Sequence, residues 1–221
     1  MIKDRGGFNG YNVFVFTVKN GTVFCGNEIV DKNALDGIVK SFCNGLIQSV
    51  IYQGEFENSL YEKSVNTIRL ITVRKKDCVE HEIVAALQRI GCDKTAPVDN
   101  FSQGGFSALI DLETGELGPI TSAFSKDQEM NQLFYDCHPD NGKKIRGKVI
   151  PNWPKIKEEI IDLTRKVPFF DYIAWDVVLK DEGIAVIETN MKSSLDPFQA
   201  HYGMRNSKLG DVYRRNGYLD H

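Results

Sequence analysis

The sequence of 221 residues lacks the features that would indicate a membrane protein or a nucleic-acid-binding protein. It has no apolar run approaching the roughly 20 residues that a membrane-spanning helix needs. It also lacks a strong charge of either sign, because 27 lysines and arginines oppose 30 aspartates and glutamates, for a formal net charge of −3. Such a balance gives no general attraction to nucleic acid or to an anionic membrane. We therefore expect neither nucleic acid nor a membrane span.

Cysteine is sparse and shows no pairing pattern. The count is odd and no C-x-x-C pair occurs, which argues against a disulfide framework and against common zinc motifs. Reduced thiols in a cytoplasmic protein are the better interpretation. The five positions are Cys25, Cys43, Cys78, Cys92 and Cys137.

The familiar nucleotide and zinc signatures are missing too. No P-loop, dinucleotide-binding fingerprint or H-E-x-x-H pair occurs. What the N-terminus does contain is Gly6-Gly7-Phe8-Asn9-Gly10, shortly after Lys3. Taken alone, this stretch is best interpreted as a plain turn, because glycine readily adopts the backbone angles of tight turns.

The hydropathy pattern predicts an α+β protein with a change of character near residue 53. In residues 1–53 we expect a small lobe with a helix and three strands, followed by a polar hinge at 53–63. The expected strands cover 11–18, 22–25 and 46–52, with a turn at Asn20-Gly21, and the expected helix covers 31–42.

Residues 54–221 are predicted to form a larger lobe built on an antiparallel sheet. Hydrophobic runs favour strands, and one amphipathic stretch with Pro154 in its first turn favours a helix at 153–167. The expected strands cover 65–73, 78–87, 106–111, 117–121, 172–179 and 184–188.

The last two of these strands form a hairpin with an acidic end. Residues two apart on a strand share a face, so Glu188 and Asn190 project together, and Asp176 reaches them from the other strand. Two carboxylates and an amide oxygen suit Mg²⁺, which bridges nucleotide phosphates and neutralises charge during transfer. The alternative is that these are ordinary solvated residues at the ends of strands.

Three other polar residues invite a functional interpretation. Arg69 interrupts the apolar run Ile68–Ile71, so its guanidinium needs an anion, which is either a phosphate or a nearby acid. His138 lies in a loop rich in proline, aspartate, asparagine and glycine, and we expect it to be exposed. His81, on an alternating strand, is expected at the surface.

Five ordered motifs resemble the ATP-grasp superfamily, and most closely its sugar-transfer-associated family, which is related to alpha-L-glutamate ligases. The resemblance runs from Lys3 to about Asp196. The motifs are Ser64-Val65-Asn66-Thr67-Ile68-Arg69, Val98-Asp99-Asn100-Phe101-Ser102-Gln103-Gly104-Gly105, His138-Pro139-Asp140-Asn141-Gly142, Ala174-Trp175-Asp176 and Glu188-Thr189-Asn190.

The resemblance implies a fold of two α+β lobes with the nucleotide site between them, and it implies roles for individual residues. Lys3 would reach the α- and β-phosphates of ATP, and Arg69 the γ-phosphate or an acyl phosphate. Metal binding would fall to Asp176, Glu188 and Asn190. The remaining implied contacts are the lid glycines Gly6, Gly7 and Gly10, the adenine-binding strand with Ile51 and Tyr52, and the site floor at Asn100, Gly104 and Gly105.

The implied activity is that of a carboxylate–amine ligase using ATP and Mg²⁺. ATP phosphorylates a carboxylate, and an amine then attacks the acyl phosphate. The resemblance points to small or sugar-linked substrates in cell-surface polysaccharide assembly. A small-molecule kinase and a catalytically weak nucleotide-binding module remain alternatives. Family members carry a lysine and helices before the glycine loop, so we expect the lid lobe of this chain to be incomplete.

Overall fold

The computed structural model describes residues 1–5, 13–26, 28–75, 78–217 and 219. The chain divides into two compact units, Met1–Tyr52 and Gln53–His221. The sequence had placed the boundary between 53 and 54. In the described part of the chain, no helix is both long and apolar enough to span a bilayer.

The unit Met1–Tyr52 contains two small antiparallel sheets and one helix. The helix α1 (Lys32–Ser41) begins after Asp31, whose side chain accepts a hydrogen bond from the Ala34 N–H, and Phe42 is its C-cap, so the two caps coincide with the ends of the predicted range 31–42. One sheet pairs β1 (Ile2–Asp4) with β5 (Gly45–Ile47), and the other contains β2 (Phe16–Lys19), β3 (Thr22–Cys25) and β4 (Glu28–Ile29).

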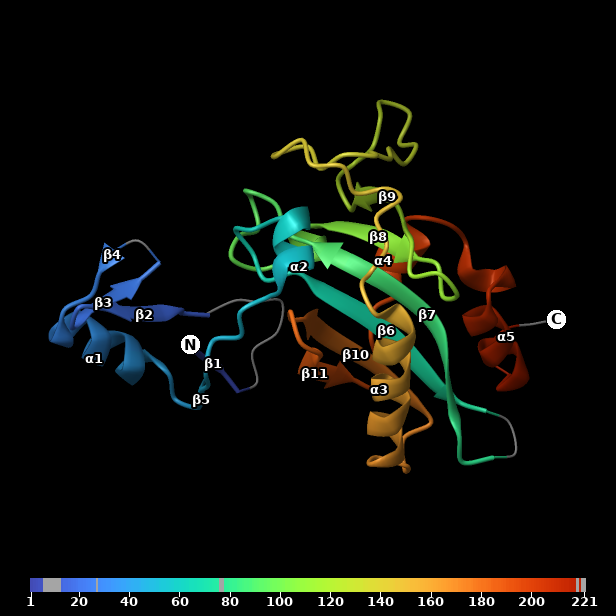
Figure 1. Cartoon of the computed structure of the whole chain (residues 1–221), viewed down its shortest axis with the longest axis horizontal. Coiled ribbons are helices and arrows are strands. Elements are labelled where there is room, and N and C mark those ends of the chain that lie inside the picture. Colours follow the sequence, from blue (N-terminus) through green and yellow to red (C-terminus); the bar gives the residue numbers. More distant parts are fainter. Residues whose placement is uncertain (6–12, 27, 76–77, 218, 220–221) are drawn as a thin grey trace. The chain divides into compact units, whose positions relative to one another are not determined.

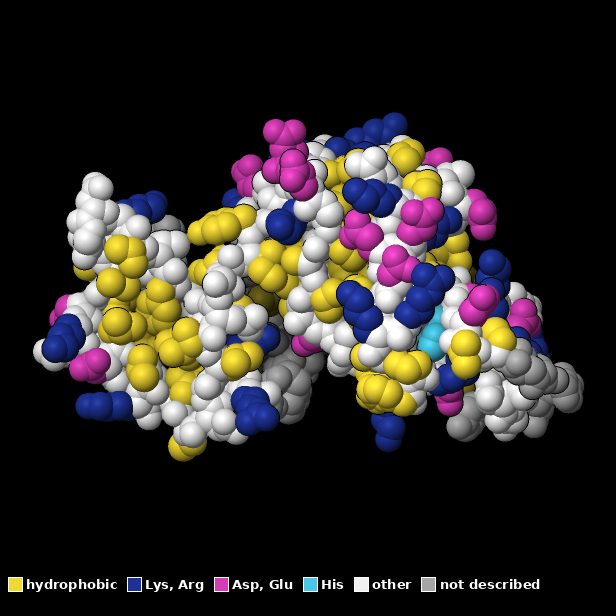
Figure 2. Space-filling model, turned by 60° about the horizontal axis from the view of Figure 1, so that its bottom comes forward, with side chains coloured by type: hydrophobic (Ala, Val, Ile, Leu, Met, Phe, Trp, Pro, Cys, Tyr) yellow, Lys and Arg dark blue, Asp and Glu magenta, His cyan; other side chains and the backbone are white. Residues whose placement is uncertain are grey.

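This unit has almost no interior of its own. Ile2 is the only buried residue among its described residues, and α1 buries none. Hydrophobic side chains gather instead on its surface, as Figure 2 shows. The large exposed ones are Val18, Ile29, Val39, Leu46, Ile47 and Tyr52.

The unit Gln53–His221 is built on a six-stranded antiparallel sheet (Figure 1). Its strands are ordered β11-β10-β6-β7-β8-β9, so the C-terminal hairpin pairs with the first long strand of the unit. The bounds are β6 (Thr67–Arg74), β7 (His81–Ile90), β8 (Phe106–Ile110), β9 (Leu117–Ser122), β10 (Tyr172–Leu179) and β11 (Ile184–Asn190).

Successive residues of the strands point to opposite faces of the sheet, and each face contributes to a separate hydrophobic core. On one face, Ile68 and Leu70 of β6 pack with Trp175 and with Trp153 and Ile160 of α3 (Trp153–Arg165). This face forms the larger core.

The opposite face is apolar only over part of its length. There, Ile71 and Val73 of β6 pack beneath the C-terminal segment through Phe198 and Leu209. That segment contains α4 (Asp196–Gln199), the 3-10 turn η2 (Met204–Asn206) and α5 (Lys208–Arg215). The rest of this face carries the polar residues described below.

Two sequence-based expectations about local structure were wrong. The predicted hinge at 53–63 contains a helix, α2 (Glu55–Leu60), which buries Glu57 and Leu60. The predicted strand at 46–52 is only β5, which ends at Ile47, so Ile51 and Tyr52 lie in irregular backbone. The segment 53–63 is mostly polar, and its short helix buries two side chains, so the hydropathy pattern did not reveal the helix.

Candidate active site

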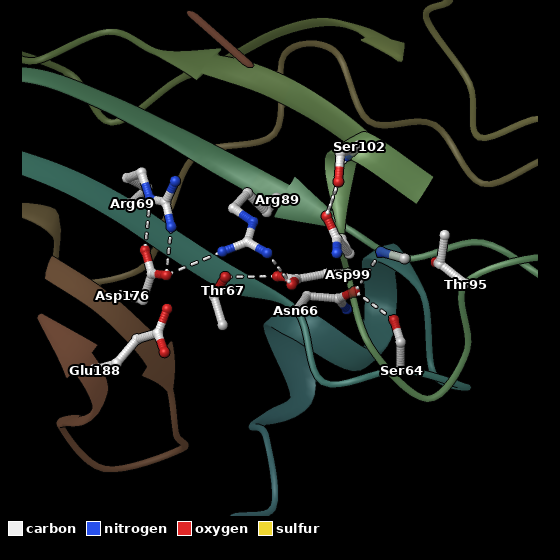
Figure 3. Close-up of polar contacts among 12 residues, drawn as sticks. Ser64, Asn66, Thr67, Arg69, Arg89, Thr95, Asp99, Ser102, Asp176 and Glu188 are labelled. Atoms are coloured by element: carbon white, nitrogen blue, oxygen red, sulfur yellow. Dashed lines mark hydrogen bonds and ion pairs between the residues drawn. The ribbon is translucent and has the colours of Figure 1, made fainter. Parts of the chain in front are cut away.

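A row of charged residues crosses three neighbouring strands on the partly polar face of the large sheet. The register pairs Asp176 on β10 with Glu188 on β11 and with Arg69 on β6. Cross-strand partners of an antiparallel sheet point to the same face, so these three side chains lie together (Figure 3). The register between β10 and β11 shifts just after Asp176, an irregularity often found beside functional sites.

Asp176 is nearly buried and is held by two arginines. Its side chain is 2% exposed. Arg69 donates through Nε to Oδ1 at 2.7 Å and through Nη2 to Oδ2 at 2.6 Å, while Arg89 donates through Nη1 to Oδ2 at 3.0 Å. The bidentate geometry makes the Arg69 pair a strong, directional one. The anion that Arg69 needed is therefore at least in part an acid of the chain itself.

The second arginine links Asp176 to another buried acid. Arg89 Nη2 lies 2.8 Å from Asp99 Oδ1, and the hydroxyl of Thr67 donates to Asp99 Oδ2 at 2.5 Å. The register places Arg89 directly opposite Thr67. Figure 3 shows the resulting chain of contacts from Arg69 through Asp176 and Arg89 to Asp99.

The arginines Arg69 and Arg89 favour the ionised form of Asp176 more than that of Asp99. Burial acts to raise the pKa of Asp176, but the hydrogen bond from Arg69 and the charges of both arginines outweigh it, so the pKa is lowered. Burial raises the pKa of Asp99, and the charge of Arg89 offsets this only in part. Asp176 is thus the anionic centre of the group.

Glu188 and Asn190 are the other two members of the predicted metal-binding set, and they lie at the edge of the sheet. Glu188 is exposed, and the Asn190 amide donates to its Oε1 at 3.2 Å, which leaves the amide oxygen of Asn190 for another partner. In the described residues, no group of three or more histidine, cysteine and acidic side chains could hold a metal. The set at this edge differs from such a group, because it combines two carboxylates with one amide.

These residues fit a single Mg²⁺ whose other ligands are phosphate and water. Asp176 accepts three hydrogen bonds from the arginines, and a carboxylate has about four acceptor positions, so Oδ1 keeps one. Asp176, Glu188 and Asp99 carry one more charge than the two arginines neutralise. Mg²⁺ is normally held by only one or two carboxylates together with water and phosphate oxygens.

The three predicted floor residues shape the connection between β7 and β8. Asn100 Oδ1 accepts from the N–H of Ser102 at 3.1 Å and starts the turn η1 (Phe101–Gln103). Gly104 has φ of 115°, and a Cβ on Gly105 would lie 2.8 Å from the Asp99 carbonyl oxygen. Glycine is thus required by the backbone here, and a nucleotide contact stays a prediction.

The other predicted nucleotide contacts belong to the unit Met1–Tyr52. Lys3 lies on β1 opposite Leu46 and is partly buried. Ile51 is partly buried and Tyr52 is exposed. Gly6, Gly7 and Gly10 lie outside the described residues.

Both histidine expectations were wrong. His138 is 0% exposed, and it stacks on Tyr61 with ring centroids 4.7 Å apart. Its Nδ1 accepts from the Asp140 N–H at 3.2 Å, so its Nε2 is the donor to the Gly91 carbonyl at 2.8 Å. His81 is also buried, with Nε2 2.7 Å from the Phe170 carbonyl. Loop composition and strand alternation do not reveal such long-range partners.

Sequence reasoning missed Arg89 and assigned no role to Asp99. The signal for Arg89 was available, because it interrupts the apolar strand β7 as Arg69 interrupts β6. Asp99 gave no such signal, since an aspartate in a connection rich in proline and glycine is usually solvated.

A comparison with protein families identifies a match over most of the chain. The family model for the sugar-transfer associated ATP-grasp matches residues 31–209, which include the candidate residues of the large sheet but not Lys3 or the glycine loop. No curated protein and no solved structure matches the chain. The chain therefore belongs to the sugar-transfer associated ATP-grasp family, which implies ATP binding and an ATP-dependent activity of the ligase type.

Proposed function

We propose that the protein is a carboxylate–amine ligase that uses ATP and Mg²⁺ and forms an acyl phosphate. The observation that supports this most is the pairing of Asp176 with Glu188 beside two arginines, in a chain of the ATP-grasp family. Hard oxygen ligands next to guanidinium groups are what the transfer of a phosphoryl group between two anions requires.

The reaction has two steps. A carboxylate oxygen of the substrate attacks the γ-phosphorus of ATP, and the bond from that phosphorus to the bridging oxygen breaks, which releases ADP. An amine nitrogen then attacks the acyl carbon, the bond from carbon to the phosphate oxygen breaks, and the amine loses a proton to the departing phosphate or to water. The products are an amide, ADP and phosphate.

The residues of the chain would stabilise charge and position the reactants. Asp176, Glu188 and Asn190 would hold Mg²⁺, which neutralises the phosphate oxygens when it is bound. Arg69 Nη1 makes no hydrogen bond within the described part of the chain, so it can donate to the γ-phosphate or the acyl phosphate. Lys3 on β1 is proposed to contact the α- and β-phosphates.

The proposed substrates follow from the family to which the chain belongs. The description of the family associates it with sugar transfer, which supports a sugar-linked carboxylate or amine and a role in cell-surface polysaccharide assembly.

Trapping the acyl phosphate tests the proposal. The protein is incubated with ATP, Mg²⁺, hydroxylamine and a panel of carboxylates that includes L-glutamate and uronic acids. We expect ADP release and formation of a hydroxamate that depend on one of the carboxylates. ADP release with radiolabelled phosphate transferred to a hydroxyl compound would instead identify a kinase. Nucleotide binding without any turnover on a broad panel would identify a nucleotide-binding module.

A further inference from the structure

Arg89 and Arg69 both contact Asp176, but their surroundings differ. Arg89 is shared between two buried carboxylates, at 3.0 Å from Asp176 Oδ2 and 2.8 Å from Asp99 Oδ1. Arg69 has one acidic partner within ion-pair distance among the described residues. If Arg89 moved away, Asp99 would lose the one ion-pair partner that it has among the described residues, so Arg89 is the more firmly fixed of the two arginines.

Asp99 is itself held from several directions. Thr67 of β6 donates to its Oδ2 at 2.5 Å. The backbone around it is tied down as well, because the Val65 N–H donates to the Pro97 carbonyl at 3.1 Å and the Gly105 N–H to the Asn100 carbonyl at 2.9 Å. Asp99 therefore anchors the far end of the Arg89 side chain to the rigid connection between β7 and β8.

This anchoring produces an asymmetry at Asp176. Among the arginines of the described residues, both Arg69 and Arg89 donate to Oδ2, whereas Arg69 alone donates to Oδ1. Without Arg89 the two oxygens would be equivalent in their contacts with Arg69. Arg89 thus restricts the free acceptor position to Oδ1, the oxygen that can still take a cation.

We propose that Asp99 and Arg89 are a positioning pair that orients the Asp176 carboxylate for the metal of the nucleotide complex. The proposal rests on the function proposed above. Neither residue is expected to touch the metal or the nucleotide, and both act through Asp176. Residues that orient a metal ligand in this way usually contribute ten- to hundred-fold to metal affinity.

The test uses Mn²⁺ in place of Mg²⁺ and ADP as the nucleotide, with electron paramagnetic resonance reporting bound and free Mn²⁺ on the full chain. Asp99→Asn is the main variant, because it keeps the shape of the side chain and removes its charge. We expect the dissociation constant of Mn²⁺ from the ADP complex to rise ten- to hundred-fold, with a changed line shape. Asp176→Asn should abolish the bound signal.

A milder variant and a matched control keep the test decisive if Asp99→Asn unfolds. Thr67→Val removes only one hydrogen bond to Asp99 and should weaken Mn²⁺ binding about fivefold, the equivalent of one hydrogen bond. Asp93→Asn changes another aspartate of the same connection, whose partners are Lys63 and Tyr61, and should leave binding unchanged.

Four outcomes would overturn the proposal. If the wild type binds Mn²⁺ with ADP, Asp176→Asn does not, and folded Asp99→Asn or Thr67→Val binds like the wild type, the positioning role alone is wrong. A loss of equal size in the Asp93→Asn control would also contradict it. If the wild type shows no bound Mn²⁺, or if Asp176→Asn binds normally, the proposed function fails together with it.

Discussion

Asp176 and Glu188 are direct cross-strand partners on β10 and β11, yet Asp176 is buried under two arginines and Glu188 is exposed to solvent. The two proposed metal ligands therefore differ in what else they do. Asp176 also neutralises buried positive charge, whereas the exposed Glu188 lies within ion-pair distance of no cation among the described residues. A substitution at Glu188 therefore tests the proposed metal site without disturbing the fold, whereas a substitution at Asp176 affects both.

Asp176→Asn should destabilise the protein, while Glu188→Gln should not. Removing one partner of a buried ion pair costs about 3–5 kcal/mol, whereas a neutral substitution at an exposed strand position changes stability by less than about 0.5 kcal/mol. Urea denaturation of both variants measures these differences. Equal stability of the two variants would show that the ion pairs of Asp176 contribute nothing in solution.

Arg69→Ala should lower both stability and turnover. Asp176 keeps Arg89 in this variant, so we expect a loss of stability of about 3 kcal/mol, at the low end for a broken buried pair. The exposed pair of Arg146 with Asp136, at 3.3 Å, supplies the control, and Arg146→Ala should cost less than about 1 kcal/mol. If Arg69 bound only phosphate, as the family resemblance implies, its removal would change stability little. A melting temperature unchanged by Arg69→Ala would favour that version and contradict the ion pair.

Glu57 should make the protein less stable as the pH rises above about 4.5. Burial, and then the charge of Asp99, raise the pKa of Glu57 well above its usual 4.5. Gln88 Nε2 donates to Glu57 Oε2 at 2.8 Å, while the Oε1 atoms of both side chains are buried without a partner among the described residues. A proton on Glu57 supplies the donor that these two oxygens lack.

The sign follows from proton binding. A carboxyl whose pKa is higher in the folded state contributes its full stability below the unfolded-state pKa and loses it as the pH rises through the folded-state value. Glu57→Gln removes this dependence, so the stability of the variant relative to the wild type should increase between pH 5 and pH 8. Glu55→Gln, exposed on the same helix, is the control. A difference that stays constant with pH would refute a protonated Glu57.

His201 should stabilise the folded state only while its imidazole is neutral. Burial lowers its pKa from 6.5 to about 4, and its Nε2 lies 2.9 Å from Ser107 Oγ. Stability should therefore fall as the pH drops from 6.5 toward 4, by up to about 3 kcal/mol for this one group. An NMR titration of the imidazole carbons reads the pKa directly. A value near 6.5 would contradict a partly buried ring that is kept neutral.

The sequence predicted the large sheet better than the small unit. Strongly apolar runs such as Tyr172–Leu179 predicted that strand with both ends correct, because a strand between two cores is hydrophobic throughout. The strand predicted at 46–52 was too long, since the described part of its unit buries only Ile2 and local apolar residues are poor guides where little is packed.

The candidate site could be predicted only as far as local spacing reaches. The hairpin spacing was enough to bring Asp176 and Glu188 together, because an antiparallel register follows from the turn between the strands. Arg89 and Asp99 enter the site through pairing between strands and a connection that the sequence does not join to the hairpin. His138 was misplaced for the same reason, since its partners Tyr61 and Gly91 are far away along the chain.

The central claim is that the end of the β10–β11 hairpin binds Mg²⁺. Isothermal titration calorimetry tests it most directly, with ADP titrated into the wild type and into Glu188→Gln, each with and without Mg²⁺. Glu188 is the exposed member of the proposed metal ligands, so its loss should affect the metal without unfolding the protein. We predict that Mg²⁺ tightens ADP binding at least tenfold in the wild type and has little effect in the variant. Equal enhancement by Mg²⁺ in both proteins would contradict a metal site at the end of the β10–β11 hairpin.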